Sequence, residues 1–248
     1  MVYEYPLRIG ISHIGRDGVL KLGSAADILQ NATWFQLDTE TAFMAFFREN
    51  HAGMYLVSRQ IVIFRLPRYG ENIRVKSWVT GCDRLFGYRN SAVYDEAGSL
   101  CIGAYAVGAF VDLEKAAPLR IPRELADQVE KYEALDMEIF PRKIPVPGGM
   151  VQKPDAIRVQ GYHLDNYSHM NNARYVDIAS ACLPEAFAVR HIRMEYKKAA
   201  LEGDIIVPWA SPACLSPQGA LSLVISLNDP GGQPYTVMEF SGLNEPVP

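Results

Sequence analysis

The side chains best suited to acid–base chemistry gather in one short segment of the chain. Asp165 stands four residues before His169, close enough across a turn for its carboxylate to orient the imidazole and fix its tautomer. Further polar residues that could support this pair are Asn166, Tyr167, Asn171 and Asn172. The spacing therefore indicates a candidate site in which a carboxylate acts together with an imidazole.

This segment is expected to lie where a strand turns into a helix, with Ser168 just before the helix and Pro184 ending it. The first residues of a helix carry free backbone N–H groups and the positive end of the helix dipole. Such groups, near Met170 to Asn172, can hold a developing oxyanion.

A second carboxylate, Glu195, lies in a segment that alternates apolar and polar residues, which predicts a strand. If Met194 and Tyr196 face one side of that strand, Glu195 faces the other. Its neighbours on that side are then Arg193 and Lys197. Because a sheet that wraps a helix can bury either face, the sequence leaves open which face carries function.

Simpler explanations compete with each of these assignments. Asp and Asn residues before a helix are most often a turn and a cap, and a glutamate beside lysines is usually a solvated ion pair. His163, Asp165 and His169 could ligate a metal, but no nearby residue completes the set, so no metal is expected. A set of basic residues in the first half is explained more simply as a solvated strand face than as a docking patch for a carrier protein. It consists of Arg65, Arg68, Arg74 and Lys76.

Composition narrows the classes of protein that fit. The chain has 248 residues, 49% of them hydrophobic, which is typical of a globular protein with a sizeable core. With 24 basic and 28 acidic side chains the net charge is −4, which argues against a nucleic-acid partner. Neither a membrane-spanning run nor a secretory signal is evident, so the cytoplasm is the expected compartment.

Cysteine usage and short motifs exclude further classes. The four cysteines lie far apart, which predicts reduced core thiols rather than a zinc ribbon or disulfides; they are Cys82, Cys101, Cys182 and Cys214. The sequence contains no glycine-rich nucleotide loop and no Gly-x-Ser-x-Gly motif. No cofactor is therefore expected.

A connector rich in proline and glycine, residues 141–154, divides the chain into halves 1–140 and 155–248. Each half is expected to hold a short strand, a helix and then several strands, with Ser24 as N-cap of the first helix. Residues 72–77 alternate like a half-solvated strand, and residues 99–113 resemble a strand buried on both sides. Since helix and strands do not alternate, the fold class is α+β.

The two halves also match each other weakly in sequence. A shift of 150 places His13 on His163, and a shift of 133 places Gly70-Glu71 on Gly203-Asp204. The change of shift implies additional residues in the first half, near Phe43 to Tyr55. This pattern indicates an internal duplication.

The ordered motifs resemble those of the acyl-acyl carrier protein thioesterases of plants and bacteria. In the second half these are Asp165-x-x-x-His169-x-Asn171-Asn172-x-x-Tyr175 and Glu195-Tyr196-Lys-Lys. In the first half they are Leu56-x-x-Arg59, Arg65-x-Pro67-x-x-Gly70-Glu71-x-Ile73-x-Val75-x-x-Trp78, Phe110-Val-Asp112-Leu and Arg120-Ile-Pro122.

The resemblance implies a tandem (double) hotdog fold, in which each half is an antiparallel sheet wrapped around one long helix. It implies hydrolysis of fatty acyl thioesters on acyl carrier protein, as in fatty acid biosynthesis. Residues 1–140 would form the acyl-chain pocket, residues 141–154 the linker, and residues 155–248 would carry the catalytic residues. By position these are Asp165, His169 and Glu195. The first half has no Asp-x-x-x-His, and Val62 stands in place of the glutamate.

Three positions depart from the family pattern. Tyr167 replaces an asparagine two residues before the histidine, although Asn166 is adjacent. Ala200 stands where many plant members carry a cysteine, which excludes a cysteine nucleophile there. Gly108 replaces a common tryptophan and is expected to enlarge or reshape the pocket.

These residues suggest attack by water, with Glu195 activating it or attacking directly, His169 contacting the thioester or leaving thiolate, and Asp165 orienting His169. Replacement of Glu195 by glutamine is then expected to remove most turnover. The alternatives are an acyl-CoA thioesterase and a non-catalytic acyl-binding module. The sequence fixes neither the preferred chain length nor the choice between monomer and homodimer.

Overall fold

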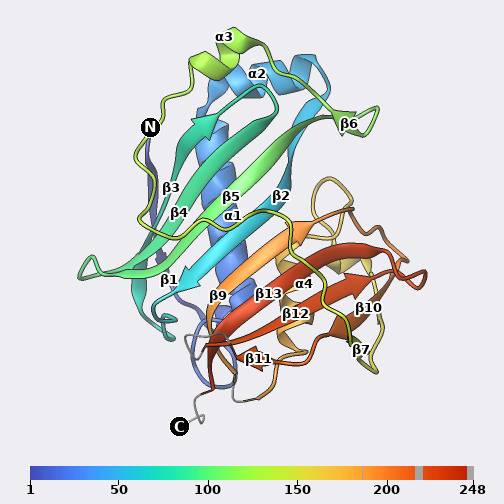
Figure 1. Ribbon diagram of the computed structural model, residues 1–248. Coiled ribbons are helices and arrows are strands. Elements are labelled where there is room, and N and C mark those ends of the chain that lie inside the picture. The colour runs from blue at the N-terminus through green and yellow to red at the C-terminus, as the bar shows by residue number, and fades with distance from the viewer. Residues whose placement is uncertain (186, 216–219, 245–248) are drawn as a thin grey trace. The chain divides into compact units, whose positions relative to one another are not determined.

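The computed structural model describes residues 1–185, 187–215 and 220–244 (Figure 1). The chain forms two compact units. The first unit comprises Met1–Lys21 and Asp27–Ile139, and the second comprises Leu22–Ala26 and Phe140–Pro248. Both units are built from antiparallel strands and few helices.

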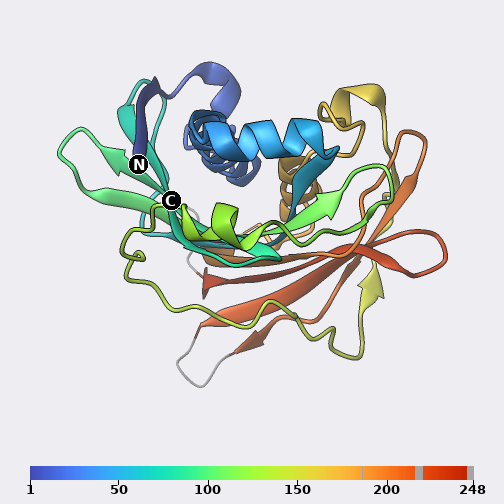
Figure 2. The same cartoon turned by 90° about the horizontal axis from the view of Figure 1, so that it is seen from above.

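The first unit is an antiparallel sheet with strand order β1-β3-β4-β5-β2, and β6 pairs with β5. Helices α1 and α2 lie on one face of this sheet (Figure 2). The elements are β1 (Tyr3–Arg8), α1 (Leu22–Thr39), α2 (Thr41–Glu49), β2 (Ala52–Ile63), β3 (Asn72–Cys82), β4 (Phe86–Asp95), β5 (Leu100–Asp112), β6 (Ala117–Pro118) and α3 (Arg123–Asp127).

The second unit is an antiparallel sheet with strand order β9-β13-β12-β10-β7, and β11 and β8 pair with β12 and β10. Helix α4 lies on one face of it (Figure 1). The elements are β7 (Val151–Gln152), β8 (Ile157–Arg158), α4 (Asn172–Ser180), β9 (Phe187–Tyr196), β10 (Ile205–Ala210), β11 (Cys214–Leu215), β12 (Leu221–Asn228) and β13 (Pro234–Asn244). The expected connector 141–154 therefore contains a strand, β7.

Hydrophobic periodicity predicted the strands well. In β3 the side chains of Ile73 and Val75 are buried while Arg74 is exposed, as expected of a strand with one solvated face. Most of β5 is buried, as its apolar run predicted. The predicted turns also form: the N–H of Gly98 donates to the carbonyl of Asp95, and that of Gly232 to Asp229.

The first residue of each helix and the number of helices in the first half were predicted less well. The first helix begins at Leu22 with Lys21 as N-cap, so Ser24 lies inside the helix rather than capping it. The second begins at Asn172 with Asn171 as N-cap and ends at Ser180, before Pro184. The additional residues expected near Phe43 to Tyr55 form a second helix, α2, whose Phe43 and Phe47 pack into the core with Phe110.

Two further expectations change in the structure. All four cysteines are free thiols, but Cys214 is exposed rather than part of a core. Gly108 opens no space in the first unit, because a Cβ atom there would lie 2.5 Å from the sulfur of Met54. The side chain of Met54 therefore fills the volume that the glycine leaves.

The duplication predicted from the two shifts is confirmed by matching backbone hydrogen bonds. The N–H of Gly15 donates to the carbonyl of Val19, as that of Asp165 donates to His169, both at 2.8 Å. Across the second shift, the N–H of Leu20 donates to Pro67, as that of Met170 donates to Ala200, again both at 2.8 Å. The same main-chain frame thus holds the turn before the helix in each unit.

A buried polar network lies between α1 and the sheet of the first unit. The Arg89 guanidinium donates to Gln36 at 2.6 Å and to Glu40 at 3.0 Å, and the hydroxyl of Ser77 also donates to Gln36. The Arg89 side chain is only 6% exposed. Burial lowers the pKa of its guanidinium, and the carboxylate of Glu40 counteracts that effect.

Candidate active site

The structure brings Asp165 and His169 together in one closed turn. Oδ1 of Asp165 accepts the N–H of Tyr167 at 2.9 Å and the N–H of His169 at 3.3 Å. The N–H of Asp165 in turn donates to the carbonyl of His169 at 2.8 Å, and that of Ser168 to Asp165. Asp165 therefore fixes the main chain that carries His169, and its second oxygen, Oδ2, takes no part in these bonds.

The polar residues around this pair have different roles. Asn171 caps α4, because its side-chain oxygen accepts the N–H of Ala173 at 2.8 Å. Asn172 is the first residue of the helix, while Tyr167 is half-buried and Asn166 is exposed. The helix cap that a cluster of Asp and Asn residues usually forms is therefore present, and it lies directly beside the Asp165–His169 turn.

Two of the three expected oxyanion donors are bonded to backbone carbonyls. The N–H of Met170 donates to the carbonyl of Ala200 at 2.8 Å, and the N–H of Asn171 donates to that of His163 at 2.9 Å. Both groups hold the turn in place and do not point a free donor at a substrate. The prediction of an oxyanion hole near Met170 to Asn172 is therefore wrong for the N–H groups of Met170 and Asn171, and it stays a prediction for that of Asn172.

Glu195 does not join this turn. Its carboxylate accepts the N–H of Ile144 at 2.9 Å and the ammonium group of Lys197 at 2.8 Å, and the side chain is 17% exposed. An ion pair between Glu195 and a neighbouring lysine is thus present, although it joins residues two apart along the chain rather than residues of two strands. These contacts tie β9 to the segment that precedes β7.

The face of β9 explains this separation. Tyr196 packs against Tyr175 of α4, with ring centroids 6.1 Å apart, so its neighbours on that face point toward the helix. Glu195 points to the opposite face, where its partner residue Val237 packs with Ile144. Figure 2 shows the chain after Phe140 running along this opposite face of the sheet. The alternation predicted for β9 is correct, but it carries Glu195 away from α4.

Three of the four basic residues considered in the first half are ion-paired. Arg65 contacts Glu71 and Asp95, and Lys76 contacts Glu4 at 2.8 Å, as does Arg74 at 3.8 Å. These pairs match the ordinary solvated strand face rather than a free docking patch. Within residues 1–185, 187–215 and 220–244 no group of three metal-binding side chains comes together.

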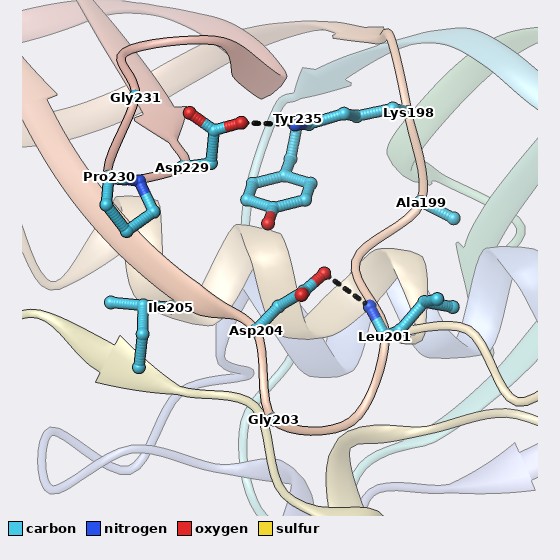
Figure 3. Close-up of a pocket in the computed structure, with 10 residues that line it drawn as sticks. All are labelled: Lys198, Ala199, Leu201, Gly203, Asp204, Ile205, Asp229, Pro230, Gly231 and Tyr235. Carbon is cyan, nitrogen blue, oxygen red and sulfur yellow. Dashed lines mark hydrogen bonds and ion pairs between the residues drawn. The ribbon is translucent and has the colours of Figure 1, made fainter.

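A pocket of about 560 Å³ opens in the second unit beside the end of β9 (Figure 3). Its charged side chains are paired with one another or with backbone. Lys198 contacts Asp229 and lies 4.4 Å from the ring centre of Tyr235, and Asp204 accepts the N–H of Leu201 at 2.9 Å. Burial and the nearby Asp204 raise the pKa of Tyr235 to about 12.

One of the three non-glycine residues with a left-handed backbone in the described part of the chain lies in the Asp165–His169 turn. Ser168 has φ of 58°, the left-handed conformation that its counterpart Gly18 adopts at φ of 76°. Replacing Ser168 with glycine is expected to raise the free energy of unfolding by up to about 1 kcal/mol. The reason is that relief of left-handed strain, about 1–2 kcal/mol, exceeds the entropic penalty of glycine, about 0.5–1 kcal/mol.

Denaturant unfolding of Ser168→Gly and of Gly18→Ser would check this expectation. The second variant should lose stability by a similar amount, because a Cβ at Gly18 meets no atom within 4 Å and only the backbone is strained. A lower free energy of unfolding in Ser168→Gly than in the wild type would show that the backbone at Ser168 stores no strain.

Solved structures of thioesterases share this fold along almost the whole chain. An acyl-ACP thioesterase from Bacteroides thetaiotaomicron is 21% identical, covers 96% of each chain and has a TM-score of 0.81. The 12:0-ACP thioesterase from Umbellularia californica is 15% identical, covers 97% of this chain and 93% of its own, and has a TM-score of 0.82. These structures and the two units above define a tandem hotdog protein of the α+β class.

Sequence comparison gives the family. The model for the acyl-ACP thioesterase N-terminal domain matches residues 1–129, and the chain belongs to the acyl-ACP thioesterase family. A further relative, the long-chain acyl-CoA thioesterase FadM of Escherichia coli K12, is 33% identical over 94 residues, which cover 31% of this chain and 70% of FadM. The protein is a thioester hydrolase that acts on fatty acyl thioesters. No helix among the described residues is long and apolar enough to cross a membrane.

Proposed function

We propose that the protein releases free fatty acid from acyl carrier protein at the turn formed by Asp165 and His169. The observation that carries this proposal is that the two reactive side chains sit on one closed turn at the start of α4. The first unit has the same main-chain turn but carries Gly15 and Val19 at the corresponding positions, which cannot exchange protons. A single reactive turn in the chain is the arrangement that we propose.

The proposed reaction is attack by water on the thioester carbonyl. Oδ2 of Asp165 accepts a proton from the attacking water, since Oδ1 is already bound by two backbone N–H groups. The imidazole of His169 donates a hydrogen bond to the thioester, and the proton taken up by Asp165 then passes by way of His169 to the departing thiolate. The products are a fatty acid and the carrier thiol. This scheme assigns to Asp165 the role that the sequence analysis gave to Glu195.

Glu195 is proposed to act on structure rather than on substrate. Its bonds to Ile144 and Lys197 hold the segment before β7 on the outer face of the second sheet. Since a carboxylate must lie within hydrogen-bond reach of the proton that it removes, its place on the face away from α4 disfavours a catalytic role.

The carrier is the second part of the proposal. The family model favours acyl carrier protein, and the similarity to FadM makes acyl-CoA the competing substrate. Release of fatty acid from a carrier fits a role in fatty acid biosynthesis in the cytoplasm. Hydrolysis of matched acyl-ACP and acyl-CoA series, from short to long chains, is expected to give the higher kcat/KM with acyl-ACP.

Parallel assays with His169→Ala provide the control for that comparison. Turnover that persists in this variant would contradict the assigned site. A higher kcat/KM with acyl-CoA at every chain length would show that acyl-CoA, rather than acyl-ACP, is the preferred substrate. Tight acyl binding without hydrolysis by the wild-type protein would support the non-catalytic alternative and overturn the proposal.

A further inference from the structure

A buried tyrosine ties the end of β9 to helix α4. The hydroxyl of Tyr175 accepts the N–H of Ala200 at 2.9 Å, and Tyr175 and Ala200 are 2% and 0% exposed. Burial raises the pKa of Tyr175, which keeps its hydroxyl protonated at neutral pH. The bond thus joins a neutral hydroxyl to a backbone group that water does not reach.

The same alanine also holds the reactive turn. The carbonyl of Ala200 accepts the N–H of Met170 at 2.8 Å, and Met170 directly follows His169. Ala200 is therefore bonded through its N–H to the helix and through its carbonyl to the turn. A displacement of Ala200 is transmitted to the backbone that carries His169.

The first unit shows which of these bonds the fold itself requires. Leu20 and Pro67 repeat the bond between Met170 and Ala200 at the same length, so both units use it. Ala25 and Pro67 occupy the positions of Tyr175 and Ala200, and they offer neither a hydroxyl nor an N–H. The fold is thus complete without the tyrosine bond, and the bond is present in the unit that holds Asp165 and His169.

We infer that Tyr175 is a positioning residue of the hydrolytic reaction, which acts through Ala200 and Met170 to fix His169. The inference rests on the proposed function, because it assigns catalysis to the turn that Tyr175 braces. Errors of about 1 Å in the placement of a reacting group can lower rates by about 10²-fold, so a brace at this distance from the chemistry is sufficient to affect turnover.

The first test replaces Tyr175 with phenylalanine, which keeps the ring packed on Tyr196 and removes only the hydroxyl. We expect kcat for acyl-ACP to fall roughly 10- to 100-fold while KM changes less than about twofold, and the pH profile of kcat to shift with the displaced imidazole. Tyr235→Phe is the matched control. Tyr235 is also buried, at 4% exposed, and its hydroxyl points toward Asp204 (Figure 3), so this variant should lose stability but retain kcat.

A double variant separates positioning from mere stability. Tyr175→Phe with Ala200→Pro copies the first unit, because it removes the hydroxyl and the N–H together and leaves no buried donor unpaired. We expect it to recover the melting temperature lost in Tyr175→Phe but not kcat. Recovery of wild-type kcat in the double variant, or an unchanged kcat in Tyr175→Phe, would overturn the inference.

The outcome also distinguishes this inference from the proposed function. If His169→Ala keeps full activity, the reactive turn itself is assigned wrongly. If His169→Ala is inactive and Tyr175→Phe keeps the wild-type kcat, the assignment of catalysis to the turn stands and only the positioning role of Tyr175 is refuted.

Discussion

Replacing Asp165 with asparagine is expected to lower kcat/KM for acyl-ACP by roughly 10²- to 10⁴-fold, the usual contribution of a general base. The amide oxygen of asparagine can still accept the N–H groups of Tyr167 and His169, so the turn should keep its shape. The loss therefore reports on the proton-accepting oxygen rather than on folding. Steady-state release of free fatty acid, with circular dichroism as a check of folding, measures it.

Glu195→Gln gives the comparison that decides between the two carboxylates. The structure leads us to expect kcat/KM within about twofold of wild type, because Glu195 faces away from α4 and bonds to Ile144 and Lys197. The sequence alone predicts the opposite, a loss of most turnover. A large loss in Glu195→Gln together with an active Asp165→Asn would restore the sequence-based assignment and refute the structural one.

The largest expected change in stability comes from Arg89. Replacing it with methionine is expected to lower the free energy of unfolding by about 3 kcal/mol, because Glu40 and Gln36 would lose a buried charged partner. Methionine preserves much of the volume, so the effect reports on the polar network rather than on a cavity. Urea unfolding at fixed pH measures this change.

Arg65→Met is the matched control, since the same side chains are exchanged in the same unit. Arg65 also pairs with carboxylates, those of Glu71 and Asp95, but its side chain is 42% exposed. Its loss is expected to change stability by less than about 1 kcal/mol, as for other solvated ion pairs. Equal losses for the two variants would show that burial of Arg89 adds nothing to the strength of its network.

Local patterns in the sequence predicted much of this molecule. The alternation of residues 72–77, the apolar run of residues 99–113 and the turn at Asp95–Gly98 depend on neighbours along the chain, and all three form as expected. The order of motifs was sufficient for the family and the fold. Asp165 and His169 share one turn for the same reason, since only four residues separate them.

Sequence patterns were less informative where distant segments decide the outcome. Alternation in β9 placed Glu195 opposite Met194, but only the packing of Tyr196 on Tyr175 shows which face meets the helix. The donors expected at Met170 and Asn171 are occupied by carbonyls of Ala200 and His163, which periodicity does not reveal. The bond from Ala200 to Tyr175 was missed as well, although the tyrosine belongs to the motif that suggested the family.

The repeated turn of main-chain hydrogen bonds has an evolutionary consequence. Those bonds join N–H and carbonyl groups that every residue except proline supplies, so they place almost no demand on side-chain identity. After a duplication, one copy could lose its reactive side chains without losing its shape. Gly15 and Val19 in the first unit, at the positions that correspond to Asp165 and His169 in the second, show that the turn forms with either set of side chains.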